Sequence, residues 1–239
     1  MSGEHDREKR RAVVEKAVLD GITRTTARDQ QKGIGPSEIG QDCDFCVGLA
    51  LTRRYPQLRR GVDAEPVLLE ESSYRRFSLK AWTGTATHEK LERDVEFPGL
   101  LKEHTFEVYW MEGYGQIVGH VDAAFLEQLT ALDYKTKDVA KIRYFKLNGV
   151  PQKEAVQLML YGWALERAGH PVEDVGLCYI PRDSNTLGDI WTAFAVYRSD
   201  YAERALERLE KLWQRVRSGD LAALERDPEC YECNQSFRI

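Results

Sequence analysis

The sequence lacks a long apolar run, a surplus of positive charge and any internal repeat. No segment approaches the roughly 20 uninterrupted apolar residues that a membrane helix requires, which argues against a membrane protein. Residues 1–11 are strongly charged and no apolar run follows them, so they do not form a secretion signal, and a cytoplasmic location is expected by default. The net charge of −5 gives no general support for a nucleic-acid partner, because a protein that binds by neutralising phosphates is normally basic.

Length and composition are those of a single folded domain. The 239 residues are enough for one sizeable core, and the apolar share of 42% is too high for a disordered chain. Within this one domain we expect an N-terminal helix and linker, a segment with a first cysteine pair, a core, and a tail with a second cysteine pair, at residues 1–35, 36–60, 79–217 and 218–239.

The core alternates between two kinds of hydrophobic period. Helical spacing of apolar residues predicts three helices, at residues 79–96, 152–168 and 200–217. Segments rich in β-branched and aromatic residues predict five strands, at residues 105–110, 117–125, 130–135, 175–180 and 191–197. A helix, three strands, a helix, two strands and a helix, in that order, indicate an α/β fold with a mixed central sheet flanked by helices.

Four of the five cysteines form two C-x-x-C pairs, one near each end of the chain: Cys43 with Cys46, and Cys230 with Cys233. In a reducing compartment, two matched pairs predict a metal site rather than disulfides. Four thiolates can close a tetrahedral site, and their spacing alone fits Zn²⁺ and an iron–sulfur cluster equally well. The fifth, Cys178, lies in an apolar stretch and is expected in the core.

Two neighbouring strands carry the strongest chemical signal. Asp133 and Lys135 are two positions apart, so both side chains project from one face of the sheet. Antiparallel pairing with the preceding strand would bring Asp122 beside Asp133. Two carboxylates at one spot repel each other unless a cation lies between them, and such oxygen ligands suit Mg²⁺ or Mn²⁺. A lysine beside the ion can orient or deprotonate a water and stabilise charge on a phosphate.

These residues belong to an ordered set of motifs. In chain order the set is G-x-x-x-H ending at His88, G-H-V-D ending at Asp122, D-Y-K at residues 133–135, and Q-x-x-x-Y from Gln157 to Tyr161. The set resembles the RecB-like branch of the PD-(D/E)XK nucleases, which includes the CRISPR-associated RecB-like exonucleases and related phage exonucleases. If a phage encodes the chain, the expected location is the host cytoplasm.

The resemblance implies a role for each motif. It implies a catalytic cation bound by three side chains and one backbone carbonyl, those of His88, Asp122, Asp133 and Tyr134. It also implies a catalytic lysine and a glutamine–tyrosine pair near the active site and the DNA, namely Lys135, Gln157 and Tyr161.

Each motif alone also has a structural explanation. A lone D-x-K on a strand is common, a lone histidine is more often exposed or hydrogen-bonded than a ligand, and Gln157 with Tyr161 could form a buried edge of one helix. The order of all four motifs, each on the expected element, favours a nuclease. Glu89 and Glu92, on the helix of His88, are expected in solvent, and His120 is given no ligand role.

The resemblance also bears on the cysteines. In the iron–sulfur members of the branch, cysteines before and after the core bind a [4Fe–4S] cluster, which favours that cluster over Zn²⁺ here. The usual pattern has one cysteine upstream and three downstream, whereas this chain has two and two, so zinc stays open. In either case the site is expected to be structural and to join the Cys43 region to the C-terminal tail.

The expected function is that of an Mg²⁺- or Mn²⁺-dependent DNA exonuclease acting on single-stranded or free ends, in recombination, repair, replication or CRISPR-type processing. Tyr55, Tyr74 or Tyr144, set among cationic residues, could stack on unpaired bases. The alternative is a non-catalytic DNA-binding or processing partner with a structural zinc or iron–sulfur site. A third candidate is a restriction-like endonuclease.

Overall fold

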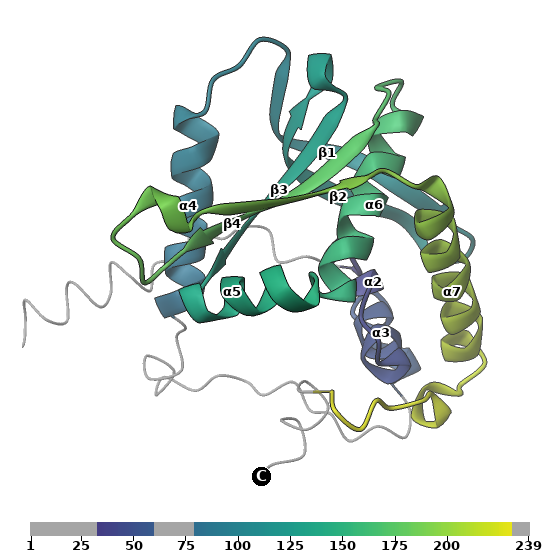
Figure 1. Cartoon of the computed structure of the whole chain (residues 1–239). Helices are drawn as coiled ribbons and strands as arrows, with labels where there is room; N and C mark the ends of the chain where they lie inside the picture. Colours follow the sequence, from purple (N-terminus) through teal and green to yellow (C-terminus); the bar gives the residue numbers. More distant parts are fainter. Residues whose placement is uncertain (1–32, 60–78, 231–239) are drawn as a thin grey trace, which may run out of the picture.

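A five-stranded sheet with helices on both faces forms the body of the protein (Figure 1). The computed structural model describes residues 33–59 and 79–230. The expected N-terminal helix, Cys233 and Tyr74 lie outside the described residues. Within these two ranges no helix is both long enough and apolar enough to cross a bilayer.

The strands lie in the sheet in chain order: β1 (Leu100–Met111), β2 (Gly115–Phe125), β3 (Thr130–Lys137), β4 (Asp174–Pro181) and β5 (Trp191–Val196). β2 is antiparallel to both of its neighbours, β1 and β3; β4 is parallel to β3, and β5 is antiparallel to β4. This arrangement confirms the predicted mixed sheet and its five strands. The first strand begins at residue 100 rather than 105, and the third ends at 137 rather than 135.

The turn between β1 and β2 ties the sheet to the N-terminal segment. Gly113 and Gly115 have φ angles of 69° and 97°, which residues other than glycine rarely adopt. Between them, the Tyr114 side chain points into the core and is only 2% exposed. Its hydroxyl accepts a hydrogen bond of 2.8 Å from the backbone N–H of Ile34, and its ring meets Trp213 edge-on with centroids 5.1 Å apart.

A parallel pair needs a crossover, and two helices provide it between β3 and β4: α5 (Val139–Asn148) and α6 (Gln152–Arg167). α6 confirms the predicted helix at residues 152–168. α5 is not predicted from the sequence. Its buried side chains are Ile142 and Phe145, which are too few to give a clear apolar period.

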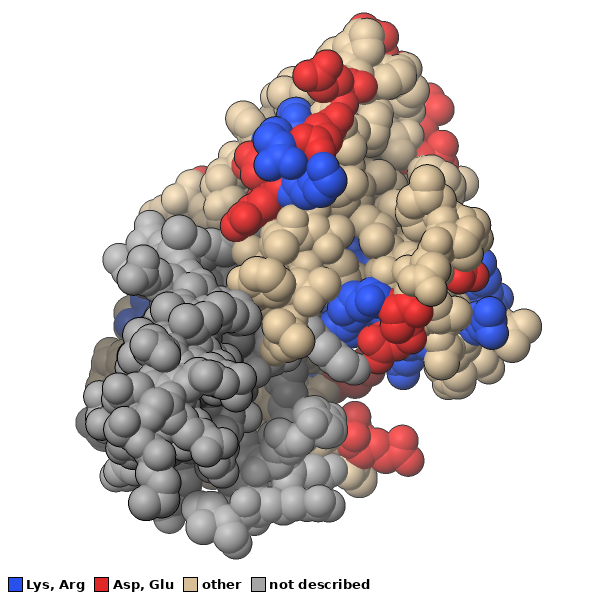
Figure 2. Space-filling view, turned by 90° about the vertical axis from the view of Figure 1, so that its left-hand side faces the viewer, with Lys and Arg blue, Asp and Glu red and all other residues tan. Residues whose placement is uncertain are grey.

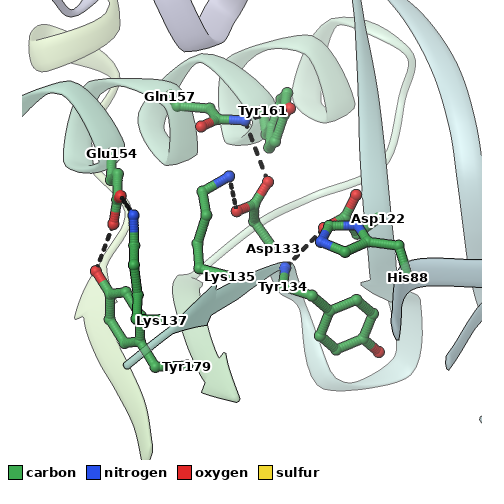
Figure 3. A network of polar contacts seen from close by, with 10 residues as sticks. All are labelled: His88, Asp122, Asp133, Tyr134, Lys135, Lys137, Glu154, Gln157, Tyr161 and Tyr179. Atoms are coloured by element: carbon green, nitrogen blue, oxygen red, sulfur yellow. Dashed lines mark hydrogen bonds and ion pairs between the residues drawn. The ribbon is translucent and has the colours of Figure 1, made fainter. Parts of the chain in front are cut away.

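α6 and α4 (Leu79–Asp94) contact opposite faces of β3. Asp133 and Lys135 point toward the helix of Gln157 and Tyr161, which is α6, whereas the intervening Tyr134 lies on the other side of the strand (Figure 3). The Tyr134 ring meets the ring of His88 on α4 edge-on, with centroids 6.1 Å apart. Side chains of the catalytic motifs therefore reach β3 from both layers.

The remaining helices bring the two ends of the described chain together. They are α2 (Pro36–Ile39), α3 (Asp44–Leu51) and α7 (Ser199–Arg217). α7 packs on α6 and α3, and its Arg208 donates to the carboxylate of Asp44 at 2.9 Å. Short 3₁₀ turns lie at Pro56–Leu58, Leu126–Gln128, Leu187–Asp189 and Leu221–Ala223.

Candidate active site

β2 and β3 stop pairing at the residues predicted to be catalytic. Their ladder runs from Phe125–Thr130 to Ala123–Leu132 and ends there. Asp122 and Asp133 are the next residues on the two strands. β3 stays paired with β4 along its whole length, so it is β2 that diverges from β3 at this point. The two carboxylates thus lie where side chains of α4 and α6 can approach them (Figure 3).

Asp122 is held from two sides. Its Oδ2 accepts a 2.7 Å hydrogen bond from the backbone N–H of Tyr134 and lies 3.4 Å from Nδ1 of His88. Gly84, one turn before His88, lets α4 approach β3, because a Cβ there would lie 3.1 Å from Oγ1 of Thr136. The hydrogen bond to Asp122 raises the pKa of His88, although burial lowers it; the charges of Asp122 and Asp133 raise it further.

Asp133 is 2% exposed and is bound by residues on both sides. Its Oδ1 accepts a hydrogen bond of 3.1 Å from Nε2 of Gln157, and its Oδ2 lies 2.5 Å from Nζ of Lys135. Burial and the charge of Asp122 raise the pKa of Asp133, while Lys135 and His88 oppose this. Burial lowers the pKa of Lys135, but the neighbouring carboxylates outweigh it, so the pKa lies above its ordinary value.

Gln157 and Tyr161 face β3 from α6, one helical turn apart. The Nε2 group of Gln157 donates to the Tyr161 hydroxyl at 2.7 Å as well as to Asp133. Both side chains are buried, and burial raises the pKa of Tyr161 well above its ordinary value. The Q-x-x-x-Y motif therefore lies beside Asp133 and fixes the orientation of its carboxylate.

A second set of contacts, not predicted from the sequence, continues the same two elements (Figure 3). Lys137, two residues after Lys135, places its Nζ 2.8 Å from Oε1 of Glu154. The other carboxylate oxygen of Glu154 accepts a 2.6 Å hydrogen bond from the hydroxyl of Tyr179 on β4. Burial and this hydrogen bond raise the pKa of Tyr179. Lys137 and Glu154 thereby fix the end of β3 against α6.

Glu103 on β1 is a further residue at the site that no sequence pattern predicts. The register pairs Lys102 with Ala123 and His104 with Val121, which places Glu103 opposite Asp122. Its φ of 44° is unusual for a residue other than glycine and directs the strand locally out of its regular course. No spacing rule links Glu103 to the other motifs; only the register between β1 and β2 brings them together.

His88, Glu103 and Asp122 fit a divalent cation. Each offers one ligand atom, and these atoms all lie within 4.8 Å of one another. One nitrogen and two carboxylate oxygens suit Mn²⁺ or Mg²⁺. Two of the predicted ligands, His88 and Asp122, are thus brought together. Asp133 lies next to them with its carboxylate toward Lys135 and Gln157, and the Tyr134 carbonyl as a ligand stays a prediction.

The other acidic and aromatic candidates lie elsewhere. Glu89 and Glu92 are exposed on α4, as expected. His120 is exposed, its Nδ1 lies 2.8 Å from Oγ1 of Thr105, and it is not one of the three residues whose ligand atoms cluster at the site. Tyr55 packs against Trp213 with ring centroids 5.2 Å apart, and its hydroxyl donates to the backbone of Tyr114, so it is a packing residue.

Three cysteines converge from the two ends of the described chain. The Sγ atoms of Cys43, Cys46 and Cys230, here called the cysteine cluster, all lie within 4.8 Å of one another, and those of Cys46 and Cys230 are 3.6 Å apart. Nearby, the N–H of Phe45 donates to the carbonyl of Glu225, so the backbone also joins α3 to the tail. Cys178 lies apart on β4. Cys233, the predicted fourth ligand, is outside the described residues.

Comparison with known proteins gives one family and several similar folds. The model of the PD-(D/E)XK nuclease superfamily matches residues 49–237. No curated protein matches the chain. Among solved structures, the chain is similar to the protein designated SSO0001, with 16% identity, a TM-score of 0.46, and coverage of 85% of this chain and 83% of that one.

The chain is also similar to an alkaline exonuclease from Laribacter hongkongensis. The identity is 9% and the TM-score 0.46, over 80% of this chain and 91% of that one. At these values neither structure informs on the substrate or reaction of this chain.

Proposed function

The chain belongs to the PD-(D/E)XK nuclease superfamily, and we propose that it is a DNA exonuclease that uses Mg²⁺ or Mn²⁺ to hydrolyse phosphodiester bonds at single-stranded or free ends. The observation that carries this proposal is the meeting of two carboxylates, a histidine and a lysine where β2 leaves β3. A module that only binds DNA gains nothing from this buried set, whereas phosphodiester hydrolysis needs each member.

In this proposal His88, Glu103 and Asp122 hold the cation, with Asp133 and the Tyr134 carbonyl as further ligands. A divalent cation supplies positive charge against the phosphate and makes a nearby water more acidic. The protein's own part is to fix the donors beforehand. The Tyr134 N–H holds one oxygen of Asp122, and α4 carries His88 to the same atom.

Lys135 supplies the second positive charge. Its ammonium group is held by Asp133, and Asp133 is held in turn by Gln157. We propose that Lys135 donates to the phosphate or to the attacking water and stabilises the charge that develops in the transition state. Gln157 is in turn hydrogen-bonded to Tyr161. The contacts that run from α6 through Asp133 to Lys135 on β3 therefore hold the lysine in position in advance.

The test is the Lys135→Ala variant, with Lys90→Ala as the matched control. Lys90 is exposed on α4 and pairs with Asp94, away from the site. We expect Lys135→Ala to abolish cleavage of linear DNA while DNA binding is largely retained, and Lys90→Ala to cleave like the parent. Unchanged cleavage by Lys135→Ala, or no cleavage by the parent with either ion, would contradict the proposal. Cutting of closed circular DNA would show an endonuclease instead.

For the cysteine cluster we propose a single tetrahedral ion, Zn²⁺, with Cys233 as the fourth ligand. Sulfurs about 2.3 Å from one ion in tetrahedral geometry are about 3.8 Å from each other. The observed separation of 3.6 Å between Cys46 and Cys230 fits that value. In a [4Fe–4S] cluster each thiolate binds a different iron, so the sulfurs stand farther apart. The sulfur geometry thus favours zinc, where the family resemblance favoured the cluster.

Metal and acid-labile sulfide content distinguish the two assignments. Protein purified without oxygen should contain one zinc per chain and no sulfide, and the Cys46→Ser variant should lose the zinc. Iron and sulfide in near-equal amounts, with a brown colour, would refute the zinc assignment and restore the cluster. Neither result alters the proposed hydrolytic residues, because the cysteines lie on α3 and the tail and not on β2 or β3.

A further inference from the structure

The crossover helix α5 carries positive charge without any negative charge. Its ten residues include Lys141, Arg143 and Lys146 and no aspartate or glutamate. All three side chains are exposed. The chain as a whole has a net charge of −5, so this helix is opposite in sign to the chain's overall charge.

None of the three cations forms an ion pair with a carboxylate in residues 33–59 or 79–230. On α4, by contrast, Lys90 and Arg93 both pair with Asp94. Blue and red side chains accordingly intermingle on the side of the molecule that carries α4 (Figure 2). Exposed cations on the two helices therefore differ in whether a carboxylate of the described residues neutralises them.

The cations of α5 are not the main contacts that hold it in place. Arg143 and Lys146 are three residues apart on one helix, where like charges repel, although Lys146 lies in the last turn, where a cation suits the helix dipole. The helix is held mainly by Ile142 and by Phe145, whose ring lies 5.4 Å from that of Tyr179. Exposed cations that no carboxylate of residues 33–59 or 79–230 neutralises are available to an anionic partner.

An exposed aromatic ring lies among these cations. Tyr144 is 55% exposed, and Nζ of Lys141 is 5.1 Å from its ring centroid. A flat exposed ring beside cations is the combination that binds single-stranded nucleic acid, because the ring stacks on an unpaired base while the cations contact phosphates. Of the other two tyrosines considered from the sequence, Tyr55 is packed and Tyr74 lies outside the described residues.

The helix also lies close to the proposed catalytic residues along the chain. α5 begins two residues after β3 ends, and Lys135 is near that end. From the rises of a strand and a helix, the Cα atoms of Lys135 and Tyr144 are at most about 22 Å apart. We infer that α5 is a track for the single strand that leaves the active site, with Lys141 and Arg143 on its phosphates and Tyr144 stacked on one of its bases. This inference rests on the proposed nuclease function.

Binding of fluorescein-labelled oligothymidylate tests the track, measured by anisotropy in the Lys135→Ala background so that no DNA is cut. The double variant Lys141→Ala/Arg143→Ala is compared with Lys90→Ala/Arg93→Ala, which removes the same charge from α4. We expect the α5 pair to weaken binding and to lower the slope of log Kd against log salt by about 1.4, two phosphates at about 0.7 each. The α4 pair should leave the slope unchanged.

Tyr144→Ala should weaken binding of the single strand about 5- to 100-fold, whereas Tyr144→Phe, which keeps the ring, should bind within twofold of the parent. Equal effects of the α5 and α4 pairs would overturn the track, as would equal binding by Tyr144→Ala and the parent. An equal loss on a blunt duplex would overturn the stacking of an unpaired base. Hydrolysis of a thymidine p-nitrophenyl phosphodiester by the parent tests the proposed function separately, since its failure leaves the binding results standing.

Discussion

Removal of one thiol from the cysteine cluster should destabilise the protein in a metal-dependent way. The perturbation is Cys46→Ser. Cys46 on α3 and Cys230 in the tail are 184 residues apart in sequence, with Sγ atoms 3.6 Å apart. An ion bound to both therefore acts as a cross-link that closes most of the chain into one loop.

The magnitude follows from the loop length. Closing a loop of 184 residues removes unfolded-state entropy worth about 5 kcal/mol at 25 °C in the chain-entropy model. This figure is an upper limit, because α3 already contacts the tail through Phe45 and Glu225 without any metal. For a chain of this size, about 5 kcal/mol corresponds to a fall in Tm of about 10 to 20 °C.

The assay is thermal unfolding of the parent and Cys46→Ser, each with zinc and with a chelator, with Cys178→Ser as the control. Cys178 is on β4, away from the cluster. A chelator would also remove the cation proposed for the active site, so the informative quantity is the difference between variants in one buffer. We expect a large difference between the parent and Cys46→Ser with zinc and almost none with chelator. The cross-link would be refuted by a difference that is the same in both buffers.

Three further outcomes follow from single contacts. Glu103→Gln should raise the Mn²⁺ concentration for half-maximal cleavage about tenfold or more. Glu107→Gln is the control, because Glu107 is exposed four residues further along β1, and it should leave that concentration unchanged. Equal metal dependence of the two variants would remove Glu103 from the cation site. Tyr179→Phe should lower the free energy of unfolding in urea by about 1–2 kcal/mol, because Glu154 loses a buried hydrogen bond. An unchanged free energy would show that this hydrogen bond does not contribute to stability. Gly48→Ala should destabilise by about 1–3 kcal/mol, because its Cβ would lie 2.3 Å from a leucine of the tail; unchanged stability would mean that the tail can move aside.

The parts of the site that the sequence predicts are those set by local spacing. Asp133 and Lys135 share a face because a strand alternates, and Gln157 and Tyr161 share a face because a helix turns in four residues. The boundaries of β2, α6 and α7 come within two residues of the predicted ones for the same reason.

The parts that it does not predict depend on contacts between distant segments. Glu103 reaches Asp122 only through the register of β1 and β2, which no motif encodes. Tyr114 sits in a hairpin turn, where exposure is the ordinary expectation, yet its hydroxyl binds Ile34, which is 80 residues away. α5 was missed because tertiary contacts to β4, rather than its own apolar pattern, hold it in place.

The order of the strands has a consequence for the time course of synthesis. Each strand pairs with its neighbour in sequence, so the sheet can assemble stepwise as the chain leaves the ribosome. α3 cannot follow, because it packs against α7 and the segment around Leu221, which emerge only after β5. Until then the side chains of Val47 and Leu51 on α3, which are buried in the finished protein, lack the cover that these two segments provide. A nascent chain that stalls before Leu221 would therefore carry a finished sheet with an exposed apolar end, a state that chaperones and proteases recognise.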